Sequence, residues 1–214
     1  MTRPERLVVV LGTGTEVGKT WVSCRLLEQL RTAGVEVAAR KPAQSFEPPG
    51  PDGPPATDAD LLAKASGEQP GDVCPPHRSY PLALAPPMAA ARLGQQAILL
   101  DDLVAELRWR SGVRVGLVET AGGVRSPIAD DADGAALAHR VEADLAVLVA
   151  DAGLGTIHAV RSSADALSPI PLVVVLNRYD ERDALHRDNR EWLSCRDDFD
   201  VVTDVVDLAE RLSR

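Results

Sequence analysis

The sequence predicts an α/β fold in which a mostly parallel sheet carries helices on both faces, as a single domain over residues 1–214. Short apolar runs alternate with segments of helical periodicity, which is typical of strands joined by helical crossovers. The apolar runs are rich in Val and Leu and lack polar alternation, as expected for strands buried on both faces. A length of 214 residues is enough for one well-buried domain and does not demand two.

The expected elements follow one another in the order that this fold requires. Strands are predicted at residues 7–11, 35–40, 113–118, 145–150 and 172–176, with a weaker one at 199–202. Helices are predicted at residues 19–32, 59–65, 101–110, 133–141, 156–167, 184–193 and 206–212. The proline-rich segment 47–55 is expected to be a surface loop, and residues 75–87 an ordered loop at the carboxyl edge of the sheet. Ligands bind along that edge in open α/β sheets, so functional residues are expected there.

The first strand leads into a glycine-rich loop, GTGTEVGKT at residues 12–20, and then into a helix with Trp21, Cys24, Leu27 and Leu30 on one face. This is a P-loop: its N–H groups surround phosphates, Lys19 reaches the β- and γ-phosphates, and the Thr20 hydroxyl ligates Mg²⁺. Five residues separate its outer glycines instead of the usual four, so the loop is a variant. The sequence thus predicts a P-loop NTPase fold that binds ATP through Gly14, Thr15, Glu16, Val17, Gly18, Lys19 and Thr20.

The second strand ends in the polar segment RKPAQS at residues 40–45. Lys41 stands at the end of a strand that we expect to neighbour the P-loop strand, where its ammonium would stabilise charge on a transferring phosphoryl group. A surface lysine at a strand end is the alternative. The functional role is favoured because Lys-Pro ends the strand sharply and the hydroxyl of Ser45 follows four residues on.

Asp58 and Asp60 open the next predicted helix. One of them can cap the helix N-terminus, and one can serve as a second carboxylate near the metal. The sequence does not choose between them.

The third strand continues as VGLVETAGG at residues 115–123. Glu119 stands at the tip of this buried strand, the Walker-B position, where a carboxylate holds Mg²⁺ or its water. A helix cap or a pair with an arginine is the alternative. Because the same chain carries a P-loop, we favour the metal role.

The fourth and fifth strands are also followed by polar segments. Residues 151–158 read DAGLGTIH and open a helix whose N–H groups could hold a carboxylate. Asn177 follows the apolar run 173–176, at the place where nucleotide-binding α/β proteins recognise the base. Its amide can both donate to and accept from adenine.

The segments GTGTEVGKT, KPAQS, VETAGG, LGTIH and LNR resemble the dethiobiotin synthetase family in order, spacing and strand position over residues 7–178. That family also has five residues between the P-loop glycines. The resemblance implies an ATP-dependent ligase that joins CO₂ to the diamine 7,8-diaminopelargonic acid and releases ADP and phosphate. One amine forms a carbamate, ATP phosphorylates it, and the second amine closes the ureido ring. The chain departs from the family pattern at Thr120 and His158, where the family has glycine and asparagine.

The resemblance also implies roles for individual residues. Lys19 and Lys41 stabilise the charge of the phosphoryl transfer, and Asn177 contacts adenine. Mg²⁺ is held by Thr20, Asp58 and Glu119. Thr13 and Ser45 lie beside the carbamate and diamine, and the helix start at Gly155, Thr156 and Ile157 meets the substrate carboxylate across a homodimer.

Composition limits the partners. The net charge is −9 and no Lys or Arg cluster stands out, so neither nucleic acid nor an anionic membrane surface is expected to bind. The three cysteines are far apart and fit reduced thiols. Neither a signal-peptide pattern nor a membrane-spanning apolar run is present. We expect a cytoplasmic enzyme whose partners are the diamine, CO₂ and a second copy of itself.

Three other functions are the alternatives. A deviant P-loop ATPase of the partition or maturation type would act on a protein partner, but such proteins usually have lysine at the second loop position, where this chain has Thr13. An amide-forming ligase that uses glutamine would need a glutaminase region, for which 214 residues leave no room. Thr120 is compatible with a paralogue that binds nucleotide without turnover, although Lys19, Lys41 and Glu119 are all retained.

Overall fold

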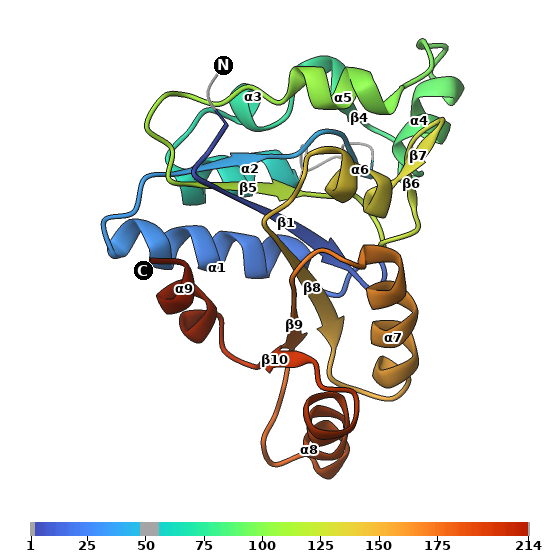
Figure 1. Cartoon of the computed structure of the whole chain (residues 1–214). Helices are drawn as coiled ribbons and strands as arrows, with labels where there is room; N and C mark the ends of the chain where they lie inside the picture. Colours follow the sequence, from blue (N-terminus) through green and yellow to red (C-terminus); the bar gives the residue numbers. More distant parts are fainter. Residues whose placement is uncertain (1–2, 48–55, 214) are drawn as a thin grey trace.

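The structure, a computed structural model, describes residues 3–47 and 56–213. Six parallel strands form the central sheet in the order β10-β9-β8-β1-β5-β2 (Figure 1). Their bounds are β1 (Arg6–Gly12), β2 (Val37–Arg40), β5 (Val115–Glu119), β8 (Leu145–Asp151), β9 (Leu172–Asn177) and β10 (Asp200–Val202). Two small sheets join β3 (Gln44–Ser45) in parallel to β4 (Ser79–Tyr80), and β6 (Pro127–Ala129) antiparallel to β7 (Ala132–Asp133).

Helices cover both faces of the central sheet. Alternate residues of β1 point to opposite faces, so Val8 and Val10 share a core with α1, α2, α3 and α9, whereas Leu7, Val9 and Leu11 share one with α4 to α7. The predicted fold class is therefore confirmed. The helices are α1 (Lys19–Thr32), α2 (Asp58–Ser66), α3 (Pro70–Val73), α4 (Pro86–Arg92), α5 (Leu100–Glu106), α6 (Gly134–Arg140), α7 (Thr156–Leu167), α8 (Ala184–Glu191) and α9 (Val205–Ser213), with a 3₁₀ turn η1 (Pro76–Arg78) and a π-helical turn η2 (Trp192–Arg196).

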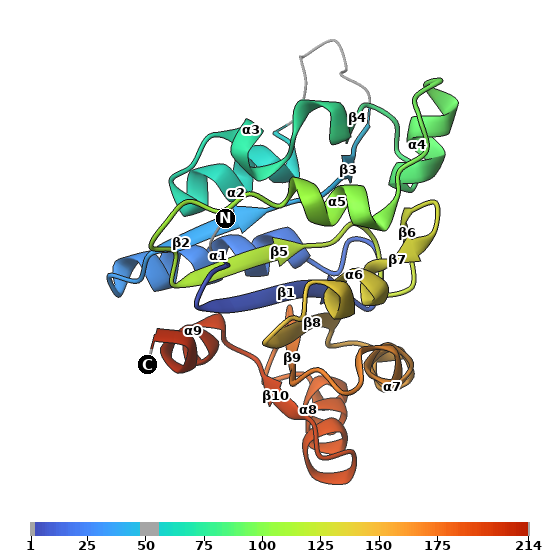
Figure 2. The ribbon, with the colours of Figure 1, turned by 45° about the horizontal axis from the view of Figure 1, so that its top comes forward.

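The expectation that the Lys41 strand neighbours the P-loop strand is wrong. Figure 2 shows β5 between β1 and β2, and β2 pairs only with β5 in the described part of the chain. Lys41, which follows β2, is still connected to the P-loop side of the site. The connection runs through Glu119 at the carboxyl end of β5, because β5 lies between β2 and β1 and Glu119 contacts both Lys41 and Thr20. Strand order depends on tertiary packing, which a single sequence does not specify.

Several predicted boundaries were also wrong. The helix predicted at 101–110 ends at Glu106. Beyond it, the Arg40 side chain donates to the Arg108 carbonyl at 2.6 Å and stacks on Trp109, and these contacts tie the segment to the end of β2. The helix predicted at 184–193 gives way to η2 after Glu191. Residues 75–87 are not only a loop, since they contain η1, β4 and the start of α4.

Two expectations concern residues at the limits of the description. Residues 48–55 of the predicted loop 47–55 lie outside the described residues, and the extent of one domain over 1–214 stays a prediction. Within the described ranges, no helix has the length and apolar character needed to cross a membrane.

Candidate active site

A cleft of about 800 Å³ opens at the carboxyl ends of β1, β5 and β2, where the sequence predicted the site. The P-loop forms one wall and the start of α4 another. The predicted site residues that line the cleft are Thr15, Glu16, Gly18, Lys19, Thr20, Lys41, Ser45 and Asp58.

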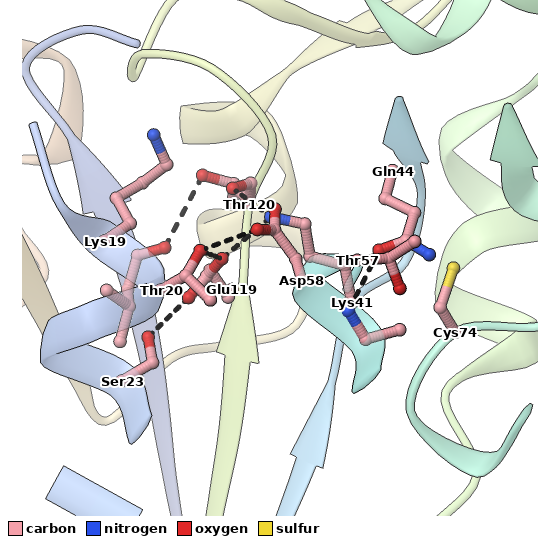
Figure 3. A network of polar contacts seen from close by, with 12 residues as sticks. Lys19, Thr20, Ser23, Lys41, Gln44, Thr57, Asp58, Cys74, Glu119 and Thr120 are labelled. Atoms are coloured by element: carbon pink, nitrogen blue, oxygen red, sulfur yellow. Dashed lines mark hydrogen bonds and ion pairs between the residues drawn. The ribbon is translucent and has the colours of Figure 1, made fainter. Parts of the chain in front are cut away.

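Four polar side chains converge at the base of this cleft. The Thr20 Oγ1 atom lies 3.0 Å from Asp58 Oδ1 and 2.8 Å from Glu119 Oε1 (Figure 3). Lys41 Nζ donates to Asp58 Oδ2 at 2.7 Å and to Glu119 Oε1 at 2.8 Å. The second Glu119 oxygen accepts from the Ser23 hydroxyl at 2.6 Å. The geometry thus joins the predicted catalytic lysine to the predicted carboxylates directly.

The electrostatics of the cluster favour its charged forms. Burial alone would lower the pKa of Lys41, which is 2% exposed, but Glu119 and Asp58 outweigh it and hold this pKa above its ordinary value. Burial would raise the pKa of Asp58, yet the Lys41 ammonium keeps it below the usual range. For Lys19, burial and then the charge of Lys41 lower the pKa. Lys41 is therefore held in its charged form, and that charge acts on Lys19 strongly enough to lower the pKa of the P-loop lysine.

Asp58 and Asp60 have different roles. The N-cap of α2 is Thr57, whose side chain accepts from the Asp60 N–H while the Asp60 carboxylate accepts from the Thr57 N–H. Neither aspartate is the N-cap, which corrects that expectation; Asp60 is the second half of a capping box. Asp58 is the first residue of α2, and its carboxylate contacts Thr20 and Lys41 instead of the helix N-terminus.

Thr20, Asp58 and Glu119 offer the donor set that suits Mg²⁺. A hydroxyl and two carboxylates are hard oxygen ligands, and Mg²⁺ usually takes one or two carboxylates together with substrate phosphates. Among residues 3–47 and 56–213, no three His, Cys, Asp or Glu side chains gather into a protein-only metal site. The residues therefore fit a magnesium ion that is shared with a nucleotide.

A second pocket, of about 440 Å³, lies beside the P-loop helix. Asn177 lines this pocket, and its Nδ2 atom donates to the Val17 carbonyl at 2.9 Å, which leaves Oδ1 for a ligand; its contact with adenine stays a prediction. Trp21 lines both pockets and is 57% exposed, so its prediction as part of a buried helix face was wrong. The prediction was right for Leu27 and Leu30, and the buried face of α1 also includes Val22 and Leu26.

Other predicted substrate residues lie in different surroundings. Ser45 lines the cleft, and its buried Oγ atom has no hydrogen-bond partner within the described structure. Thr13 is not among the residues lining the cleft, and its hydroxyl faces the Val149 carbonyl at 3.5 Å. The residues 155–157 form the start of α7, also outside the cleft lining, so their contact with a substrate carboxylate stays a prediction.

Thr120 does not crowd the cleft. Its Oγ1 atom faces the Val10 carbonyl at 3.5 Å, its methyl group lies toward Gly134, and its backbone carbonyl accepts from Lys41 at 3.3 Å. The side chain is buried in the core and is not part of the cleft lining. The bulk that replaces the family glycine is therefore directed away from the site.

Sequence reasoning missed Gln44 and Arg178. The Gln44 amide accepts from the Ala59 N–H at 3.0 Å and donates to Ser79 Oγ at 2.8 Å, which fixes the start of α2 next to the cleft. Arg178 contacts the P-loop carbonyl of Glu16 at 2.9 Å. Gln44 lies in the segment KPAQS and Arg178 in the segment LNR, but neither segment indicates which distant residue the side chain contacts.

Comparisons with known proteins place the chain in a family. A family model described as AAA domain matches residues 6–207. Proteins named ATP-dependent dethiobiotin synthetase BioD are similar: one from Anaeromyxobacter sp. strain Fw109-5 is 39% identical over 186 residues, 83% of this chain and 79% of that protein. One from Haloferax mediterranei is 36% identical over 196 residues, 88% of this chain and 79% of that protein.

A further relative of the same name, from Caulobacter vibrioides strain NA1000, is 45% identical over 129 residues, 58% of this chain; the match spans only 56% of its own length. Among solved structures, the signal recognition particle receptor FtsY from Elizabethkingia anophelis has a TM-score of 0.54 at 14% identity, covering all of this chain and 67% of that one. This likeness concerns the fold alone.

Proposed function

The chain belongs to the family of ATP-dependent dethiobiotin synthetases, and we propose that it closes the ureido ring of dethiobiotin from 7,8-diaminopelargonic acid and CO₂ at the expense of ATP. The observation that carries the proposal is the buried Lys41 ammonium, held between Asp58 and Glu119 at the base of the P-loop cleft. The names of the relatives support synthesis of dethiobiotin over a switch ATPase that acts on a protein partner.

The proposed reaction needs positioning and charge stabilisation rather than a covalent protein nucleophile. One amine of the diamine adds to CO₂ and loses a proton, giving a carbamate. A carbamate oxygen attacks the γ-phosphorus and ADP leaves. The second amine then attacks the carbonyl carbon of the mixed anhydride, and phosphate leaves as the ring closes.

The residues of this chain supply the charge for these steps. Lys41 is held in its protonated form by two carboxylates, so its charge is present before the substrates arrive. Lys19 lies on the P-loop, where its Nζ atom donates to the Gly14 carbonyl at 3.1 Å and can turn to a phosphate. The Ser45 hydroxyl, which has no hydrogen-bond partner among the described residues, would offer a hydrogen bond to the carbamate or the diamine.

Thr20, Asp58 and Glu119 would hold Mg²⁺, which neutralises the charge of phosphate oxygens when it is bound. Asn177 would accept a hydrogen bond from the amino group of adenine through Oδ1, since its Nδ2 atom is already bonded. The homodimer and the cytoplasmic location stay predictions.

The test is phosphate release by the purified protein with ATP, Mg²⁺ and bicarbonate, with and without 7,8-diaminopelargonic acid, while product masses are measured in parallel. We expect diamine-dependent turnover and a cyclic urea product. Lys41→Met should abolish it, whereas Lys64→Met, at an exposed lysine of α2, should not. Slow turnover that is indifferent to the diamine would overturn the assignment.

A further inference from the structure

The P-loop is held from outside by two consecutive residues at the end of β9. Asn177 Nδ2 donates to the Val17 carbonyl at 2.9 Å, and Arg178 Nη2 donates to the Glu16 carbonyl at 2.9 Å. The other terminal nitrogen of Arg178, Nη1, donates to Asp151 Oδ2 at 3.0 Å. Asp151, the last residue of β8, is itself fixed because its Oδ1 atom accepts from the Gly153 N–H at 3.1 Å.

These bonds determine which way two peptide groups of the loop face. In a trans peptide the carbonyl and the following N–H point in opposite directions. With the Glu16 and Val17 carbonyls drawn to β9, the N–H groups of Val17 and Gly18 are turned away from it, as a phosphate cradle requires.

The backbone indicates that this arrangement is imposed. Glu16 has φ 61° and Arg178 has φ 58°, a left-handed conformation that non-glycine residues rarely adopt without tertiary support. Strain on both sides of one hydrogen bond means that the contact is maintained against local preference. Gly18, with φ 93°, also has no room for a side chain, because an added Cβ would meet Asn177 Nδ2 at 2.0 Å.

We propose that Arg178 is a positioning residue for phosphate binding, and that the bridge Asp151–Arg178–Glu16 holds the P-loop in its anion-binding form. This proposal rests on the proposed function in one respect, which is that the P-loop binds nucleotide phosphates. It is independent of which diamine is carboxylated.

A direct electrostatic role is the competing explanation, because the Arg178 side chain is 59% exposed and the residue lines the cleft. Asp151→Asn separates the two. This change weakens the hold on Arg178 but keeps its charge and removes a nearby negative charge. If Arg178 attracts phosphate directly, the variant should bind nucleotide as well as the wild type or better. If the bridge positions the loop, the variant should bind more weakly.

The experiment is calorimetric titration of the full chain with ADP, GDP and pyrophosphate, together with steady-state kinetics in ATP. Arg178→Ala and Asp151→Asn should each weaken ADP and pyrophosphate binding by about tenfold. The ADP-to-GDP ratio should stay unchanged because the base is not involved. KM for ATP should rise with little change in kcat. Arg211→Ala breaks a similarly exposed pair with Asp200 and should match the wild type.

The outcomes are separable. Wild-type affinity in Arg178→Ala would show that the bridge does not position the loop. Weak binding in Arg178→Ala together with normal or tighter binding in Asp151→Asn would assign a direct charge effect and overturn the proposal. A wild-type protein that binds neither ADP nor pyrophosphate would contradict the proposed function itself. Thermal unfolding of each variant shows whether it is folded, and Asp151→Asn keeps the test open should Arg178→Ala fail to fold.

Discussion

Replacing Lys41 with Met should destabilise the protein substantially as well as abolish turnover. The ammonium bonds both Glu119, which is fully buried, and Asp58, whose side chain is 40% exposed. Removing one partner of a buried pair typically costs about 3–5 kcal/mol. Asp58 can turn to water, so its share resembles that of a surface pair, about 0–1 kcal/mol. Most of the loss therefore comes from Glu119, and we expect a total of about 3 kcal/mol.

The assay is urea unfolding at neutral pH without nucleotide, followed by circular dichroism. Lys64→Met is the matched control and should stay within about 0.5 kcal/mol of the wild type. Adding Glu119→Gln to Lys41→Met should recover part of the loss, because no carboxylate charge is then left fully buried at that place. If the free energy of unfolding of Lys41→Met fell by less than about 1 kcal/mol, the view that the Lys41–Glu119 pair is shielded from water would be refuted.

Two further predictions concern other parts of the chain. Asp58→Asn should raise the Mg²⁺ concentration needed for half-maximal turnover by at least about tenfold. Asp60→Asn should leave that concentration unchanged, but it should lower the free energy of unfolding by about 0.5–1 kcal/mol because it weakens the capping box with Thr57. Burial opposes ionisation of Glu106, but its two bonds from Arg78 hold its pKa below the ordinary value. Its contribution to stability is thus present above about pH 4.3 and is lost as the pH falls through the lower folded pKa. Urea unfolding of wild type and Glu106→Gln should therefore differ by about 1 kcal/mol at neutral pH and converge in acid; a constant difference would contradict this.

The parts of the candidate site whose positions in the fold the sequence predicted are those with local signals. A strand, a glycine-rich turn and a Lys-Thr helix start are consecutive in the chain, so the P-loop needed no tertiary information. Glu119 was found in the same way, as a carboxylate at the end of an apolar run. The structure brings Glu119 within 2.8 Å of Thr20 because β5 pairs directly with β1.

What the sequence left open depends on contacts between distant segments. The order β1-β5-β2 is set by packing, so the route by which Lys41 reaches the site could not be derived. Trp21 was placed on the apolar helix face because it lies in register with Cys24, Leu27 and Leu30, yet it lines the two pockets beside α1 and is exposed. Arg178 gave no signal at all, since its partners Glu16 and Asp151 lie 162 and 27 residues away.

The choice between Asp58 and Asp60, which the sequence analysis left open, follows in the structure from a local capping pattern. Residues two apart on a helix are about 200° apart around its axis, so only one of the two can face a given cleft. Thr57 stands three residues before Asp60, in the spacing of a capping box, which draws the Asp60 carboxylate back to the helix N-terminus. Once Asp60 is committed there, Asp58 is the carboxylate left to turn toward Thr20 and Lys41. The capping box thus selects the site residue as well as starting the helix, and Gln44 fixes the same turn by accepting from the Ala59 N–H.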